Sequence, residues 1–193
     1  MTAFTRPVTV LVLLAGLAAL AQCGSSASAD PAHAAGLLAF DRVHAVLMHP
    51  RCVNCHPAGR APLQGDDSRP HEQNVQGGVD GQGRFAMRCS NCHGTSNAPG
   101  EHAPPGAPNW HLPAAEMPLV FEGRSKAELA RQLADPRQNG GRTPQQLLAH
   151  LRMDPLVLWG WQPGEGRTRV PIAHADFVAA AAAWIEAGCP IPD

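Results

Sequence analysis

CVNCH at residues 52–56 and CSNCH at residues 89–93 are two copies of one pattern, C-x-x-C-H. This pattern is the attachment motif for c-type haem. Two thiols three residues apart on one turn can add to the two vinyl groups of a single porphyrin, and the histidine that follows can then bind the iron. The motifs therefore predict two covalently bound haem c groups, attached through Cys52, Cys55, Cys89 and Cys92, with His56 and His93 as the proximal iron ligands.

Two other interpretations of the four motif cysteines remain open from the sequence. The cysteines could form a four-cysteine zinc site, or each pair could be a redox-active disulfide. A histidine directly after each pair and an export signal at the N-terminus favour haem over zinc. The βαβ pattern in which thioredoxin-like motifs occur is missing from the sequence, which makes the disulfide interpretation weaker still.

The composition limits the class of protein. The chain has 193 residues, which indicates one domain, and its 19 glycines and 19 prolines indicate that much of it is loop. Lys and Arg total 15 against 16 for Asp and Glu, so the chain resembles neither a basic nucleic-acid-binding protein nor an acidic disordered tail. Histidine is abundant at 10 residues, beside 6 cysteines and 5 methionines, and these side chains bind metals and haem iron.

Residues 1–29 have the pattern of an export signal. Arg6 supplies a positive charge before an apolar run at residues 8–21. That run is shorter than the roughly 20 residues that a transmembrane helix needs. We therefore expect export of the chain rather than a membrane span.

Two processing sites are compatible with this signal. Ala27-Ser28-Ala29 has the small-x-small form of an ordinary cleavage site. Residues 20–24 resemble a bacterial lipobox that would lipidate Cys23, although Gln22 stands where that motif usually has Gly or Ala. We expect a periplasmic protein, either soluble or lipid-anchored at Cys23, with cleavage to a soluble domain of residues 30–193 as the favoured form.

Helix signals lie towards the two ends of the exported chain. Residues 57–123 show no sustained period of 2 or 3.6 residues, and a structureless segment of that length in a compact domain needs something to order it. The gap between His56 and Cys89 is too short for a complete small cytochrome fold around the first haem. The predicted fold is therefore mostly α: a single cytochrome c-like diheme domain with long irregular loops ordered around two haems. Its expected helices run from Asp30 to Pro50, from Ser125 to Asp135, from Thr143 to about Met153, and from His174 to about Ala187.

An iron that only carries electrons also needs a sixth ligand, which His or Met supplies. His71 and His111 are the preferred candidates, because both lie in loop-like stretches and Trp110 gives His111 an apolar flank. For any one of these residues, a histidine at the surface or behind a ligand is about equally expected. Met117 is the main competitor, and Met48 and Met153 fall in helical patterns typical of core residues. The remaining competitors are His49, His102, His150, His174 and Met87.

Several longer stretches of the chain resemble a known family. The resemblance covers roughly residues 49–190 and is to a bacterial group of small diheme c-type cytochromes, often labelled by association with isoquinoline 1-oxidoreductase, a molybdenum hydroxylase. It implies an electron acceptor that works beside a periplasmic dehydrogenase. Compared with single-haem cytochromes c, the chain departs by placing Pro57 directly after His56. The stretches that carry the resemblance are HPRC at 49–52, PLQGDD at 62–67, MRC at 87–89, PGAPNWH at 105–111, NGGR at 139–142 and WQPGEGR at 161–167.

The sequence therefore predicts an electron-transfer protein rather than an enzyme. Two haems would carry single electrons from a periplasmic dehydrogenase, such as a molybdenum hydroxylase, towards another cytochrome or a terminal oxidase. The alternatives are a diheme peroxidase-like enzyme with one open iron site and a haem-based sensor. Known diheme peroxidases are considerably longer, and no signalling domain accompanies the motifs. No nucleic-acid partner is expected, and a membrane contact is expected only through lipidated Cys23.

Overall fold

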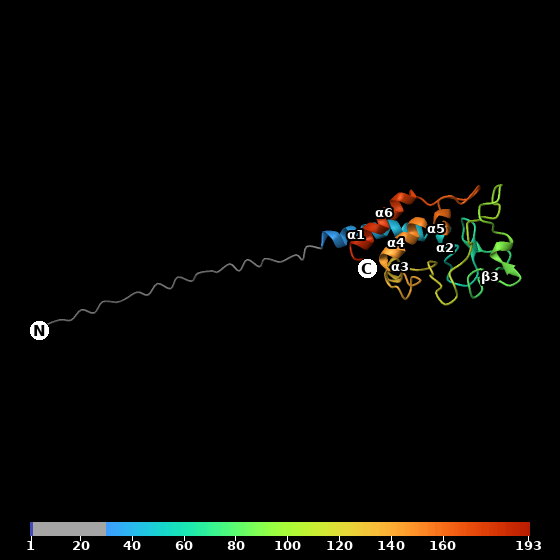
Figure 1. Ribbon diagram of the computed structural model, residues 1–193. Helices are drawn as coiled ribbons and strands as arrows, with labels where there is room; N and C mark the ends of the chain where they lie inside the picture. Colours follow the sequence, from blue (N-terminus) through green and yellow to red (C-terminus); the bar gives the residue numbers. More distant parts are fainter. Residues whose placement is uncertain (2–29) are drawn as a thin grey trace.

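The structure is a computed structural model that describes Met1 and residues 30–193 (Figure 1). The expected export signal, with its lipobox and cleavage site, falls at residues outside this description. Within the described part of the chain, no helix is both long and apolar enough to cross a membrane.

Helices build one half of the molecule, and the irregular segment that carries β3 extends from it (Figure 1). The longest helix, α1 (Pro31–Leu47), packs against α6 (His174–Glu186) and α3 (Lys126–Ala134), and α4 (Pro144–Met153) also packs against α6. Two short helices, α2 (Pro50–Val53) and α5 (Pro155–Trp159), complete the set. The mostly α prediction is confirmed.

Local capping explains where the helices begin. The side chains of Ser125 and Thr143 each accept a hydrogen bond from the backbone N–H three residues later. The side chains of Glu128 and Gln146 in turn accept from the backbone N–H of Ser125 and of Thr143. These two capping boxes start α3 and α4 where the sequence predicted. Asp30 caps α1 in a simpler way, by accepting from the N–H of Ala32.

The hydrophobic core lies between α1, α3, α4 and α6. Phe40 of α1 and Trp184 of α6 are fully buried, with ring centroids 4.9 Å apart. Gly36 permits the close approach of α1 to the end of α6, because a Cβ atom at this position would lie 2.5 Å from the Cβ of Ala187. The core is thus made mainly by these four helices, and the segment of residues 57–123 contributes Phe121 to it.

The segment from residue 57 to residue 123 contains only short regular elements. β1 (Leu63–Gln64) pairs with β2 (Arg69–Pro70), β3 (Gly83–Arg84) pairs with β4 (Met87–Arg88), and a 3-10 turn, η1, spans Cys89–Asn91. Backbone hydrogen bonds hold the loops together. The N–H of Leu112 donates to the carbonyl of Gly81 at 2.9 Å, and a Cβ at Gly81 would lie 1.8 Å from the Leu112 carbonyl oxygen. This close approach requires glycine.

Candidate functional site

The two C-x-x-C-H motifs adopt the same local turn. In the first motif, which α2 leads into, the N–H of His56 donates to the carbonyl of Cys52 at 3.2 Å. In the second, which forms η1, the N–H of His93 donates to the carbonyl of Cys89 at 2.9 Å. Each turn therefore brings two thiols and one imidazole onto a single loop of backbone. The motif repeat seen in the sequence is also a repeat of structure.

Each motif histidine is oriented by a hydrogen bond at one ring nitrogen. His56 Nδ1 lies 2.7 Å from the carbonyl oxygen of Leu119, and His93 Nδ1 lies 2.7 Å from that of Pro105. Because a carbonyl oxygen can only accept, each Nδ1 carries the hydrogen, and the lone pair of each neutral ring is at Nε2. Histidines that bind metals are typically held in this way.

The segment that faces His56 is fixed to it at several points. Leu119, whose carbonyl accepts from the ring, has a left-handed φ of 38°, an unusual backbone conformation for a leucine. The N–H groups of Phe121 and Glu122 both donate to the His56 carbonyl, at 2.9 and 3.2 Å. Phe121 also stacks on the imidazole, with ring centroids 3.9 Å apart and planes 16° apart. These contacts hold the ring in one orientation.

His93 has a matching aromatic neighbour. Trp110 stacks on its imidazole, with centroids 4.9 Å apart and planes 9° apart. Burial lowers the pKa of His93. Burial, with a smaller effect of nearby cationic groups, lowers the pKa of His56 to about 4. At each ring the hydrogen bond to the backbone carbonyl acts in the opposite direction and raises the pKa. Both rings are therefore neutral at physiological pH, which is the form that binds a metal.

The motif thiols are free. Burial raises the pKa of Cys52 to about 12 and that of Cys55 to about 11, and it also raises the pKa of Cys89. Cys92 is exposed. No disulfide joins the motif cysteines, and in residues 30–193 no three His, Cys, Asp or Glu side chains are gathered so that they could hold a metal ion. The structure thus does not assemble the four-cysteine zinc site that the sequence left open.

His71 lies beside the second motif. Its ring centroid is 6.2 Å from that of His93, and the two ring planes are 69° apart. The Nδ1 atom of His71 is buried and has no hydrogen-bond partner. Two imidazoles on opposite sides of one metal ion would have centroids about 6 Å apart, because each metal–nitrogen bond is about 2 Å long. This spacing and the unpartnered nitrogen fit a metal between His71 and His93.

For the first motif, the structure does not single out one candidate for the sixth ligand, as it does with His71 for the second. Among the described residues, no hydrogen bond or ring contact joins a second histidine to the His56 imidazole, whose aromatic neighbour is Phe121. His111 Nδ1 is anchored 2.5 Å from the carbonyl oxygen of Asn109. His150 Nδ1 lies 3.3 Å from a carboxylate oxygen of Asp154, an arrangement that leaves Nε2 unengaged. The sequence named His150 only as a competitor, although its i, i+4 spacing to Asp154 on a predicted helix was a signal for this pair.

Other candidates are engaged elsewhere or exposed. His49 accepts from the N–H of Arg51 and caps α2, and His174 bonds the carbonyl of Leu151 through Nε2. His102 is exposed beside Glu101. The expectation that Met153 is a core residue is wrong, because it is 64% exposed at the end of α4. The buried residues of α4 are Leu147 and Leu151 instead.

An aromatic row connects the surroundings of the two motifs. Trp110, which stacks on His93, meets the edge of Trp159 with centroids 4.9 Å apart. The guanidinium of Arg51, the residue before Cys52, lies 5.8 Å from the ring of Trp159. Arg51 is only 4% exposed, and it pairs with Asp66 at 2.5 Å. Trp110 and Trp159 thus connect His93 of the second motif to Arg51, the residue before the first motif.

The residues at both motifs fit covalent haem. Each motif offers two free thiols on one turn and an imidazole whose Nε2 lone pair is available to iron, and the second offers a further histidine at a suitable spacing. Comparison with protein-family models, with curated proteins and with solved structures finds no match to this chain.

Proposed function

We propose that the chain is a periplasmic diheme c-type cytochrome that carries single electrons between a dehydrogenase and a downstream respiratory acceptor. The observation that carries this proposal is the matched pair of hydrogen bonds, 2.7 Å each, from the Nδ1 atoms of His56 and His93 to backbone carbonyls. Two C-x-x-C-H motifs that share this histidine orientation are most simply explained as two sites for the same cofactor.

The residues around the second motif favour a carrier over a catalyst. If His71 and His93 both bind one iron, no coordination position remains for peroxide or for a diatomic gas. We therefore assign His71 as the sixth ligand at the second motif. At the first motif the candidates for the sixth ligand are His111 and His150, both of which are oriented through Nδ1.

The chain's own residues would perform four tasks in this function. Haem iron, once attached, supplies a one-electron couple. Each pair of motif thiols would hold one haem, and the carbonyls of Leu119 and Pro105 fix the imidazoles of His56 and His93 and make them more basic. Phe121 and Trp110 cover the imidazole faces and limit the access of water. A site that is rigid and dry changes little between oxidation states, which suits electron transfer.

The donor is expected to be a periplasmic dehydrogenase, with a molybdenum hydroxylase as the leading class from the sequence resemblance. The acceptor is expected to be another cytochrome or a terminal oxidase. Neither partner is a small-molecule substrate, so the protein itself would perform no bond-changing chemistry.

Paired serine variants test the proposal. In cells that possess c-type haem maturation machinery, we expect two covalent haems per chain in the parent protein and one in each of C52S/C55S and C89S/C92S, measured by pyridine haemochrome assay. C189S is the matched control, because Cys189 is a free thiol outside both motifs, and it should retain two haems. A parent protein with no covalent haem, or with tightly bound zinc instead, would overturn the proposal.

A further inference from the structure

Exposed apolar side chains gather at the hairpin that precedes the second motif. Phe85, at the turn between β3 and β4, is 99% exposed, and Val79 is 77% exposed; both line the same open cavity of about 470 Å³. Met87, in β4, is exposed as well. Single exposed apolar residues are ordinary, but two that line one cavity, with a third in the same hairpin, mark a surface that binds something.

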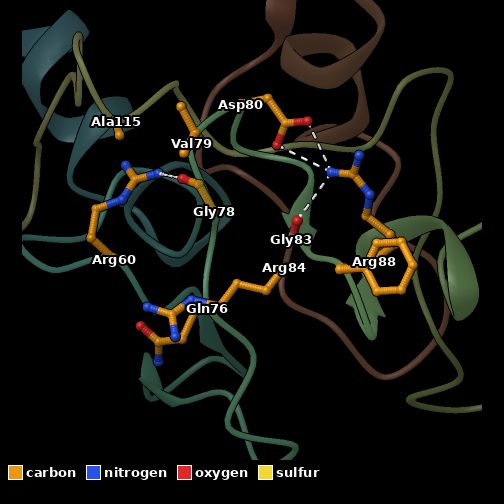
Figure 2. Close-up of a pocket in the computed structure, with 10 residues that line it drawn as sticks. Arg60, Gln76, Gly78, Val79, Asp80, Gly83, Arg84, Arg88 and Ala115 are labelled. Carbon is orange, nitrogen blue, oxygen red and sulfur yellow. Dashed lines mark hydrogen bonds and ion pairs between the residues drawn. The ribbon is translucent and has the colours of Figure 1, made fainter.

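Arginines surround these apolar residues. Arg60, Arg84 and Arg88 line the cavity, with Asp80 as the acidic residue among its lining side chains (Figure 2). Arg88 pairs with Asp80 at 2.9 Å, whereas Arg60 donates to two carbonyls, those of Gly78 at 2.6 Å and Pro113 at 3.3 Å. Within residues 30–193, Arg60 and Arg84 have no carboxylate partner. The surface therefore carries excess positive charge.

This local charge is opposite to that of the whole chain. The formal net charge is −1, and removal of the expected signal would take away Arg6 and no acidic residue, which makes the mature chain more acidic. A positive patch on an acidic protein attracts an acidic partner and orients it, because the remainder of the surface repels that partner. The patch would thus select one face for contact.

The position of the patch relates it to the second motif. Arg88 is the residue before Cys89, the N–H of Cys89 donates to the carbonyl of Gln82 in the same hairpin, and Cys92 is exposed. Thioether attachment places one edge of a porphyrin at these cysteines. A partner seated on the hairpin would therefore lie close to that edge, and a short distance is what electron transfer between proteins requires.

We propose that the β3–β4 hairpin and the surrounding arginines form the docking surface for an acidic electron-transfer protein, one that presents carboxylates around a small apolar spot. This inference rests on the proposed function, since it names the chemistry of the partner. Phe85 and Val79 would supply the apolar contact, and Arg60 and Arg84 the charge. A contact of this size is weak and short-lived, as encounters between redox proteins are.

The test measures oxidation of the reduced haem-loaded protein by an acidic blue-copper protein in stopped flow. One electron passes in this reaction, so haem iron goes from Fe(II) to Fe(III) and copper from Cu(II) to Cu(I). At low ionic strength we expect R60Q/R84Q and F85S each to slow the second-order rate about tenfold, and R60Q/R84Q also to flatten its dependence on salt. The matched control is R152Q/R169Q, which removes the same charge from exposed arginines outside the cavity and should change the rate less than twofold.

Two results would overturn the proposal that this surface binds the partner. Unchanged rates in both variants would show that the partner docks elsewhere. Altered haem content, absorption spectrum or reduction potential in F85S would show that Phe85 contacts the protein's own haem instead of a partner.

A second measurement separates this inference from the proposed function. Chemical-shift changes in the isotope-labelled, haem-loaded chain on addition of the blue-copper protein report complex formation independently of electron transfer. Shifts concentrated at residues 79–88 support the surface, and shifts elsewhere, or none, contradict it. A haemochrome assay on the same sample independently tests whether the chain is a cytochrome.

Discussion

At the scale of single residues, the candidate site depends on backbone carbonyls that the motifs do not contain. The rings of His56 and His93 donate to the carbonyls of Leu119 and Pro105, which are 63 and 12 positions away in the sequence. These partners fix which ring nitrogen carries the hydrogen, and so which one can face iron. The proposed chemistry of each motif therefore depends on how the loops fold back over it.

Replacing His71 tests whether it is the sixth iron ligand at the second motif. We expect H71A to keep both covalent haems but to convert one iron from low-spin to high-spin, because the ring 6.2 Å from His93 would be lost. Electron paramagnetic resonance on the oxidised protein measures this change. H71M should restore a low-spin iron with a higher reduction potential, since a methionine ligand raises the potential.

The control for this variant is H102A, because His102 is exposed and lies against Glu101. H102A should leave both irons as in the parent protein. A low-spin spectrum that persists in H71A would remove His71 from the ligand set.

The sequence located the motif residues because their pattern is contiguous, and it ranked His71 and His111 first as sixth ligands only because they lie in loop-like stretches. That pattern does not show which partners the fold gives each ring. The His150–Asp154 pair has the local i, i+4 spacing of a helix, whereas the His71 ring lies 6.2 Å from that of His93, at a distant position in the chain. Long-range placement of this kind has no signal in local spacing.

At the scale of elements, helices with strong capping signals were predictable and short ones were not. α3 and α4 begin at their capping boxes, and α6 covers almost the whole predicted range. α5 was missed, because five residues are too few for a helical period to emerge, although Asp154 caps it. The hairpins were unpredictable for the same reason, since each strand has only two residues.

The packing of α1 against the end of α6 can be tested at Gly36. Alanine in a helix is favoured over glycine by about 1 kcal/mol, but the added Cβ would lie 2.5 Å from Ala187 Cβ and 2.7 Å from Pro190 Cγ. Overpacking of this kind typically costs about 1–3 kcal/mol, which exceeds or cancels the gain, so we expect G36A to lower the free energy of unfolding by up to about 2 kcal/mol. Denaturant unfolding followed by circular dichroism measures it.

Gly59 provides the comparison for this substitution. A Cβ at Gly59 would have nothing within 4 Å, so G59A should change the stability by less than about 0.5 kcal/mol. If G36A were more stable than the parent protein, the close approach of α1 and α6 would be wrong.

At the scale of the whole molecule, buried histidines link folding stability to pH. The pKa of His44 in α1 is lowered by burial and by the charge of Lys126, with Asp41 acting against them, and its Nε2 has no hydrogen-bond partner. The folded protein therefore binds this proton less readily than the unfolded chain, and stability falls as the pH drops below about 6.5.

Replacing His44 tests this linkage. H44Q should reduce the loss of unfolding free energy between pH 7 and pH 5, because glutamine does not titrate. H33Q, which changes an exposed histidine of the same helix, should keep the slope of the parent protein. Equal slopes in H44Q and the parent would show that folding does not change the pKa of His44. Urea unfolding at a series of pH values supplies the measurement.

The architecture of the molecule also bears on why its central segment is irregular. The core is built mainly from α1, α3, α4 and α6; residues 57–123 contribute Phe121 to it and are otherwise held by backbone contacts such as those of Gly81. Two attached haems would add apolar surface that this segment has little of. The sequence predicted that this segment is irregular, while the contacts that stabilise its loops depend on positions far apart in the chain.

The most direct test of the central claim is the haem content and spin state of the matured full-length protein. Pyridine haemochrome assay and electron paramagnetic resonance on one sample give both quantities. We expect two covalent haems per chain with both irons low-spin. One high-spin iron that binds added ligands would contradict the carrier and favour an enzyme or a sensor, and the absence of covalent haem would contradict the cytochrome itself.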